Sequence, residues 1–239
     1  MSRVRGALRD GVFFIGWKGV AFCVLLGVAN YVTSLGYDYL NHGPYRLFLR
    51  SPLDDALPVV PLFVVPYVSL KPFLYGSLVI FLLFRARIFQ SAVLSMIATF
   101  LVSYLFFAFL QSYVDRPVLT GNDGLTRMIR DVYAGDHPFN DFPSLHVSLS
   151  TIMAIHWWRF SRTLRWPVAI CAGLIAVSTV MVKQHYLVDI PGGLILAFAT
   201  SLFFLRLLGP DRDREAIAQS RPPRSTVTAS SAPGHGGDV

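Results

Sequence analysis

Residues 88–114 decide the fold class, because they read IFQSAVLSMIATFLVSYLFFAFLQSYV without a single Asp, Glu, Lys or Arg. A helix rises about 1.5 Å per residue, so about 20 apolar residues cross a hydrocarbon core roughly 30 Å thick. The stretch therefore predicts a transmembrane helix. Shorter uncharged runs repeat the pattern at 19–37, 142–158, 166–182 and 190–205.

The composition of the chain points to the same class. Of its 239 residues, 54% are apolar and 15% are charged, whereas an average soluble domain is about 25% charged. A soluble domain is excluded, since the chain lacks the polar surface to cover itself. Two Cys exclude a disulfide scaffold, and a net charge of +7 in so apolar a chain indicates basic loops beside a bilayer rather than a nucleic-acid partner.

The spacing of the runs predicts an all-α, polytopic membrane protein with six transmembrane helices. Residues 56–84 are interrupted only by Lys71 and are rich in Pro, so we expect a Pro-rich segment followed by a span. The first apolar segment is long enough to remain as an anchor. The predicted spans are roughly 15–35, 63–84, 90–113, 143–159, 167–183 and 189–207.

The distribution of basic residues predicts the orientation. Most of the 21 Lys and Arg residues fall on the side that carries both termini, which places the termini in the cytoplasm. We expect a basic cytoplasmic N-terminus at 1–14, a catalytic transmembrane domain at 15–207, and a disordered cytoplasmic tail at 208–239 that is rich in Ser, Pro, Gly and Arg. The sequence indicates no oligomeric state.

Polar residues at the span ends form three clusters. Ionisable groups at membrane depth are costly, so they are candidates for function. The predicted topology places all three clusters at the non-cytoplasmic face. They are Asp115-Arg116-Pro117, Pro143-Ser144-Leu145-His146 and the run Lys183-Gln184-His185-Tyr186-Leu187-Val188-Asp189.

The residue types in these clusters suit phosphoryl transfer. His185 and Asp189 are four residues apart and share a face if the segment is helical. A carboxylate beside an imidazole fixes its tautomer and leaves the other ring nitrogen free to attack. His146 is a second imidazole that is suited to protonating a leaving oxygen. Taken singly, a histidine at a span end is more often structural.

Fixed cations and a hydroxyl complete a candidate phosphate site. Arg116 and Lys183 would neutralise a phosphoryl group, and Ser144 could donate a hydrogen bond to one of its oxygens. An Arg-Pro pair often marks only a helix terminus. Two His and one Asp could instead ligate a metal, but Cys and Glu partners are lacking, so we expect no metal and no other cofactor.

The three clusters together resemble the type-2 phosphatidic acid phosphatase superfamily over about residues 60–207. The resemblance implies a metal-independent enzyme in which His185 forms a phosphohistidine. It implies that Asp189 orients His185 and that His146 protonates the leaving alcohol. It also implies that Arg116 and Ser144 bind the phosphate.

Three positions depart from the family's motifs. The family has Lys where this chain has Phe109, Gly where it has Leu145, and Arg where it has Thr179. Lys183 lies four residues after Thr179, one helical turn along, and we expect it to supply the missing cation. Lys71 is a candidate for the other missing charge, or is merely an interfacial lysine.

The resemblance implies that the bilayer surrounds the protein and that a phospholipid, sphingolipid or polyprenyl phosphate is its substrate. A lipid phosphate phosphatase with its site at the outer face is the first interpretation. Leu145 and the His185-Tyr186 pair are similar to the inositol-phosphorylceramide synthase branch, which transfers the group to a hydroxyl. An inactive lipid-binding or transport protein is a further alternative. The loop 118–142 either recognises a head group or is simply solvated.

Overall fold

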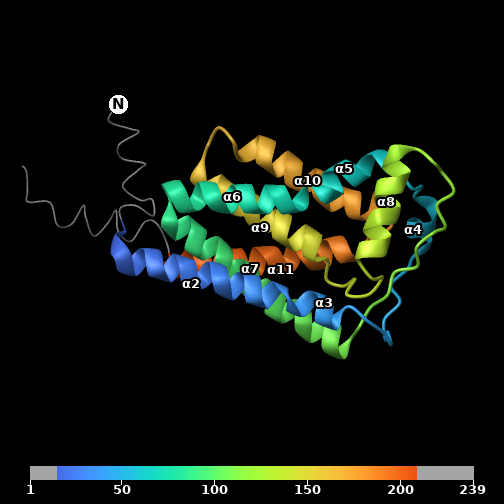
Figure 1. The fold of residues 1–239 in the computed structure, drawn as a ribbon, viewed down its shortest axis with the longest axis horizontal. Coiled ribbons are helices and arrows are strands. Elements are labelled where there is room, and N and C mark those ends of the chain that lie inside the picture. The colour runs from blue at the N-terminus through green and yellow to red at the C-terminus, as the bar shows by residue number, and fades with distance from the viewer. Residues whose placement is uncertain (1–14, 209–239) are drawn as a thin grey trace, which may run out of the picture. The chain divides into compact units, whose positions relative to one another are not determined.

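The computed structural model describes residues 15–208, so the predicted N-terminal arm at 1–14 and all but the first residue of the predicted tail lie outside the described residues. Within that range the regular structure is helical, apart from two isolated β-bridges. Figure 1 shows the arrangement. The elements are α2 (Gly16–Ser34), α3 (Gly36–Leu40), α4 (Pro52–Ala56), the 3₁₀ turn η2 (Pro61–Phe63), α5 (Val64–Val68), α6 (Leu70–Phe84), α7 (Ala86–Phe109), α8 (Gly124–Gly135), α9 (Leu145–Phe160), α10 (Arg165–Met181) and α11 (Asp189–Leu208).

Among the described residues, four helical segments are long and apolar enough to cross a membrane. They are Gly16–Leu40, Pro61–Phe84, Ala86–Phe109 and Asp189–Leu208. A helix also occupies each of the other two predicted spans, but α10 has 17 residues and α9 has 16. The helices agree with an integral membrane protein, while the count of six spans stays a prediction.

The third predicted span begins and ends earlier than expected. The sequence predicts it at 90–113, whereas α7 covers Ala86–Phe109 and therefore includes Arg87. A long Arg side chain can extend to the interface from the end of a span, so its charge does not stop the helix. After Phe109 the chain runs extended, and Tyr113 forms a bridge with Phe139. The Asp115-Arg116 pair thus follows an extended segment instead of ending a helix.

Helix α9 is the central helix of the described bundle. It packs against α6, α7, α10 and α11, and it lies among them in Figure 1. Its side chains are buried nearly all round, with Val147, Ile152 and Met153 fully inaccessible. A helix that is apolar on every side is expected to be surrounded by other helices. The start of α9 is therefore held at a fixed place in the bundle.

Several polar side chains inside the bundle are paired across helices. Nε2 of His156 lies 3.0 Å from the Ser91 hydroxyl, and its Nδ1 lies 2.7 Å from the Ile152 carbonyl oxygen. The Thr99 and Thr200 hydroxyls are 3.1 Å apart. Small polar residues allow helices to approach closely in an apolar medium. His156 is accordingly a structural residue of the bundle.

The segment between α7 and α9 is not a simple loop, because it contains the amphipathic helix α8. Asp123 is its N-cap and accepts a hydrogen bond from the Thr126 backbone N–H at 3.0 Å. Ile129 faces inward and is fully buried in a cluster with Val64, Tyr67 and Val182. Helix α8 therefore packs beside α5 and the loop that follows α10.

Candidate active site

The start of α9 and the start of α11 are brought together by two glycines. A Cβ on Gly193 would lie 2.8 Å from the Ser144 carbonyl oxygen and 2.8 Å from the Val147 Cβ. A Cβ on Gly192 would lie 2.5 Å from the Phe142 ring. The Ser148 hydroxyl donates to the Ser144 and Gly193 carbonyl oxygens at 2.9 and 3.1 Å. These contacts fix two of the predicted motifs against each other.

Ser144 is the N-cap of α9, and its hydroxyl accepts from the Val147 backbone N–H at 3.4 Å. Ser144 is fully buried, while His146 sits in the first turn with partial exposure. The N-terminus of a helix presents free backbone N–H groups and partial positive charge, both of which favour an anion. The predicted Ser144 and His146 thus share a helix end that suits phosphate.

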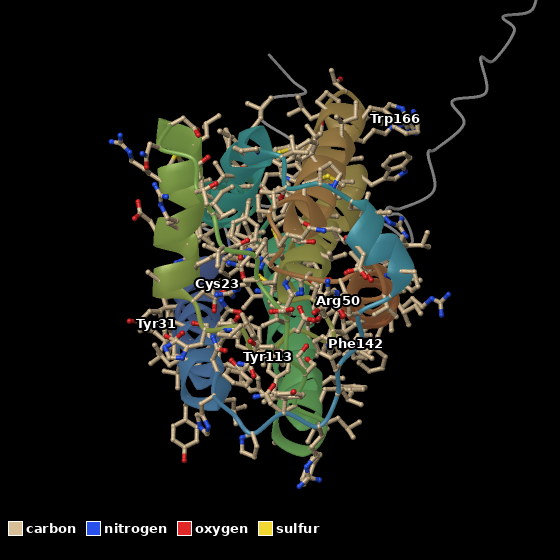
Figure 2. All side chains as sticks on the ribbon, turned by 90° about the vertical axis from the view of Figure 1, so that its right-hand side faces the viewer. Cys23, Tyr31, Arg50, Tyr113, Phe142 and Trp166 are labelled. Carbon is tan, nitrogen blue, oxygen red and sulfur yellow. The ribbon has the colours of Figure 1, made fainter. Side chains whose placement is uncertain are left out.

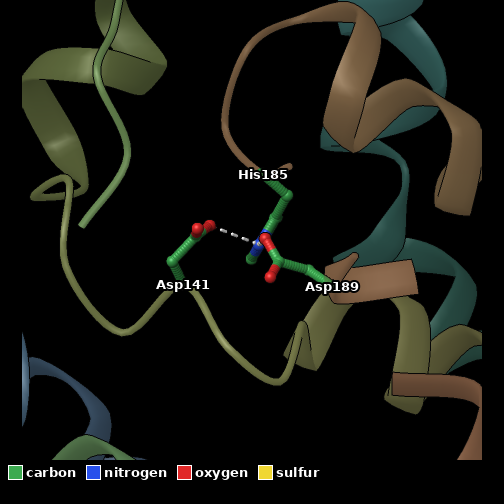
Figure 3. Close-up of side chains that lie close together, drawn as sticks. All are labelled: Asp141, His185 and Asp189. Carbon is green, nitrogen blue, oxygen red and sulfur yellow. Dashed lines mark ion pairs between the residues drawn. The ribbon is translucent and has the colours of Figure 1, made fainter. Parts of the chain in front are cut away.

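His185 lies between two carboxylates, as Figure 3 shows. Its Nδ1 is 2.8 Å from Asp141 Oδ1 and 3.3 Å from Asp189 Oδ2. Asp189 was predicted from the four-residue spacing, and it also accepts a hydrogen bond from the Tyr186 backbone N–H at 2.8 Å. Asp141 was not predicted as a site residue. Its only sequence signal is its position two residues before the Pro143-Ser144 motif.

The two carboxylates control the charge of His185. Burial by itself lowers the pKa of the imidazole, but the contacts and negative charges of Asp141 and Asp189 outweigh burial and raise the pKa to about 10. All three residues are buried, with exposed fractions of 7% for His185, 1% for Asp141 and 0% for Asp189. A buried carboxylate is costly unless it is paired. The imidazole supplies that pairing.

His146 faces the same space from α9. Its ring stacks on the Tyr67 ring at a centroid distance of 4.3 Å and lies 6.0 Å from the His185 ring. Tyr67 belongs to α5 and was not predicted as part of the site. Stacking restricts the orientation of an imidazole, so Tyr67 holds His146 toward His185. Lys71 follows one helical turn after Tyr67 and is exposed on α6.

Lys183 follows the C-terminal end of α10 and has an unusual backbone conformation. Its φ of 55° is left-handed, and the Gln184 backbone N–H donates to the Thr179 carbonyl oxygen at 2.9 Å. This is the Schellman arrangement, in which glycine is the usual left-handed residue. The Lys183 Nζ donates to the Asp54 carbonyl oxygen at 2.7 Å. Burial lowers the pKa of Lys183, although nearby Asp54 opposes that effect.

A pocket of about 370 Å³ opens beside His185 and Lys183. Arg50 stands at its edge, where its guanidinium contacts Asp55 at 2.5 Å and Asp115 at 3.0 Å. Figure 2 labels Arg50 in a view from the side that carries α8 in Figure 1. The pocket therefore combines cations with carboxylates. Its lining is Arg50, Asp54, Asp55, Leu57, Val59, Val114, Asp115, Pro117, Lys183, His185 and Tyr186.

Arg116 is the predicted phosphate ligand whose two terminal nitrogens are already engaged, while its buried Nε has no hydrogen-bond partner among the described residues. Its guanidinium donates to the backbone carbonyl oxygens of Tyr133, Asp136 and His137, and to the side-chain oxygen of Gln184. It also lies over the Tyr133 ring, 4.9 Å from the centroid. Arg116 thus joins the end of α8 to the loop that carries His185. A role as phosphate ligand stays a prediction and requires these contacts to rearrange.

The His185 cluster has the donor set of a possible metal site as well. One atom each from Asp141, His185 and Asp189 lie within 4.8 Å of one another. One nitrogen and two carboxylate oxygens suit several divalent metals. The same spacing suits a proton held between two carboxylates.

Comparison with known proteins gives one match. A family model described as "PAP2 superfamily" matches residues 42–203 of the chain. This range includes all three predicted clusters and the pocket. No curated protein and no solved structure matches the chain.

Proposed function

The chain belongs to the PAP2 superfamily, the type-2 phosphatidic acid phosphatases and their relatives, and we propose that it is a lipid phosphate phosphatase that works through a phosphohistidine on His185. Membership indicates an enzyme of the phosphatase or phosphotransferase type, with lipid phosphate substrates in a membrane setting. The observation that carries the proposal is the placement of His185, whose Nδ1 contacts two carboxylates while its ring faces His146.

In the first step, Nε2 of His185 attacks the phosphorus as the bond from phosphorus to the lipid oxygen breaks. The Asp141 and Asp189 contacts keep one ring proton on Nδ1, so the Nε2 lone pair is available in the fraction of His185 that has lost its second proton. His146 donates its proton to the departing lipid oxygen. The imidazole of His185 gains positive charge as the nitrogen–phosphorus bond forms, and the two carboxylates stabilise that charge.

In the second step, water attacks the phosphohistidine and gives its proton to His146, so free phosphate leaves and both histidines return to their starting forms. The α9 N-terminus, the Ser144 hydroxyl and the Lys183 ammonium would hold the phosphate oxygens. Arg116 would join them only after exchanging a carbonyl contact for a phosphate oxygen. No step in this scheme uses a metal.

A phosphotransferase is the second candidate, and the size of the pocket favours it. About 370 Å³ is more than a phosphate group fills, and the Arg50, Asp55 and Asp115 side chains can donate to and accept from a hydroxylated acceptor. An alcohol in place of water would then attack the phosphohistidine. The first step is the same for both functions.

The proposed topology has six spans, with both termini in the cytoplasm and the site at the outer, periplasmic or extracellular face. The short helices α9 and α10 would count among the spans, since polar site residues at their ends lie where a lipid phosphate meets water. A lipid substrate would reach the site sideways from the bilayer. Cysteine labelling at each loop measures this arrangement.

The test presents the purified protein with several lipid phosphates, with and without hydroxylated acceptors such as inositol and ceramide. Free phosphate indicates the phosphatase, and a new phospholipid indicates the phosphotransferase. His185→Ala is expected to abolish both products and the labelled phosphoenzyme formed from a ³²P-lipid. His42→Ala, at an exposed histidine, is the matched control and is expected to keep activity. Full activity of folded His185→Ala would contradict the mechanism.

A further inference from the structure

We propose that Asp141 is a positioning residue for His185, a second carboxylate that shares the Nδ1 proton with Asp189 and stabilises the charged imidazole during phosphoryl transfer. The inference rests on the proposed function of His185 as nucleophile. It assigns a role to a residue that lies outside the three clusters on which the family resemblance depends.

The contact between Asp141 and His185 is the shorter of the two carboxylate contacts, at 2.8 Å against 3.3 Å for Asp189. Neither contact has the near-linear geometry of an ordinary hydrogen bond, since Nδ1 counts among the buried atoms without one. An N–H that points between two acceptors lies off the line to each, as in a bifurcated bond. The proton on Nδ1 is therefore attracted by both carboxylates.

Asp141 has no other evident task in the described part of the chain. Neither of its oxygens has a hydrogen-bond partner there, and its side chain is fully buried. A buried carboxylate that only held a loop in place would be expected to accept hydrogen bonds from that loop. Its close ionisable neighbours across the site are the His185 ring and the Asp189 carboxylate, and the imidazole is the only one of the two that can offset its charge.

The backbone on both sides of Asp141 is anchored, which fixes its direction. The Asn140 backbone N–H donates to the Gln111 side-chain oxygen at 2.9 Å, and the Gln111 amide donates back to the Asn140 side-chain oxygen at 3.0 Å. The Phe142 backbone N–H donates to the Ser112 hydroxyl at 2.7 Å. Asn140 itself has a left-handed φ of 57°, which turns the chain just before Asp141. Asp141 is thereby held against His185.

Asp141 also connects two of the predicted motifs. It lies three residues before Ser144 and five before His146, yet it contacts the histidine of the third motif. The position of the nucleophile and the position of the proton donor thus both depend on one short anchored segment. A displacement of that segment would alter the Nδ1 contact and the position of His146 together.

The chemical consequence follows from the charge that develops on His185. As the nitrogen–phosphorus bond forms and the lipid oxygen leaves, the imidazole becomes cationic, and a second nearby carboxylate lowers the energy of that state. The same carboxylate favours the protonated form of free His185, since an opposite charge within about 4–6 Å shifts a pKa by about 1–3 units. Removing its charge should therefore let His185 lose its proton at lower pH.

Other charged groups face this site and stay in place when Asp141 changes. Lys183 is on the His185 loop, while Asp115, Arg50 and Asp55 come from segments around the pocket. Because a variant at Asp141 leaves them unaltered, its effect on the titration of His185 is separable from theirs. The titratable groups around His185 are Asp189, His146, Lys183, Asp54, Asp55, Asp115, Arg50, Tyr186 and Asp136.

The experiment titrates His185 by NMR in full-length protein labelled with ¹⁵N-histidine, which requires no enzymatic activity. The His185 signals are identified by their loss in His185→Ala. In the wild type, His185 is expected to titrate well above the ordinary imidazole value. Asp141→Asn is expected to lower that midpoint by about one unit or more, Asp141→Glu to restore most of it, and Asp131→Asn, at an exposed acid of α8, to leave it unchanged.

Activity supplies the second readout. Asp141→Asn is expected to move the acidic limb of the rate–pH profile to lower pH and to reduce kcat at least 10-fold, with a smaller change in KM. An ordinary His185 midpoint in the wild type, or an unchanged midpoint in Asp141→Asn, would overturn the proposal even if the enzyme works as proposed. One equivalent of tightly bound metal in the wild type, lost in Asp141→Asn, would overturn it in favour of a metal site. If no lipid phosphate reacts, the proposed function fails, while the titration still decides the role of Asp141.

Discussion

Replacing Lys183 with Gly separates the two roles that this residue could have. Lys183 occupies the left-handed position of the Schellman motif after α10, where a residue with a Cβ costs roughly 1–2 kcal/mol. Gly removes that strain. The change also removes the hydrogen bond from Nζ to the Asp54 carbonyl oxygen, worth about 1.5 kcal/mol at such a partly exposed place, and adds about 0.5–1 kcal/mol of chain entropy to the unfolded state.

These contributions nearly cancel, so the free energy of unfolding in Lys183→Gly is expected to stay within about 1.5 kcal/mol of the wild type. For the catalytic rate, no comparable gain offsets the loss of the ammonium group. If the ammonium binds a phosphate oxygen, its loss removes about 1.5–3 kcal/mol of transition-state stabilisation, which corresponds to a rate about 10- to 150-fold lower. Stability and activity are therefore expected to change independently.

The assay compares kcat/KM for a lipid phosphate with the thermal unfolding of the purified protein in detergent. Lys183→Arg keeps the charge and is expected to retain more activity than Lys183→Gly, despite an unrelieved left-handed backbone. Lys18→Ala, at the other end of the protein in α2, is the control for loss of a lysine and is expected to behave as wild type. Wild-type activity in a stable Lys183→Gly would refute the phosphate role. Equal losses in the Gly and Arg variants would assign Lys183 to the loop structure alone.

Three further variants test the rest of the site. Gly193→Ala places a Cβ 2.8 Å from the Ser144 carbonyl oxygen, so we expect a loss of about 1–3 kcal/mol in stability and about 100-fold in kcat, measured by unfolding and turnover. Asp189→Asn should lower kcat strongly with normal membrane insertion, and an unchanged kcat would remove Asp189 from the mechanism. Arg116→Ala should lower stability by at least about 2 kcal/mol, because three backbone carbonyl oxygens lose a charged donor; unchanged stability would mean that those contacts are dispensable.

The helical segments were accessible from the sequence because apolarity and the absence of charge are local properties. Every predicted span coincides with a helix, and the errors are at the ends, as where α7 starts at Ala86 instead of residue 90. Arg87 caused that error, since a charge at a membrane interface does not interrupt a helix. Helix α8 was missed for a related reason, because its short polar sequence is helical through its cap and its packing against Val64 and Tyr67.

The candidate site was partly accessible, through spacing along the chain. His185 and Asp189 are four residues apart and make the predicted contact, although His185 lies in the loop and Asp189 begins the helix. Arg116 shows the limit of such reasoning. A guanidinium in a motif suggests a ligand, but only the fold reveals that its donors meet carbonyl oxygens at the end of α8.

The sequence by itself determined the membrane class, the order of the helical segments and the residues of the three motifs, because each depends on neighbours within a few turns. The tertiary structure alone decided that Asp141 contacts the His185 Nδ1, that Tyr67 stacks on His146, and that a pocket lies beside Lys183. These contacts join residues from different segments. The first of them also depends on Gly192 and Gly193, which let the start of α11 approach Phe142, Ser144 and Val147, a distance that no local pattern encodes.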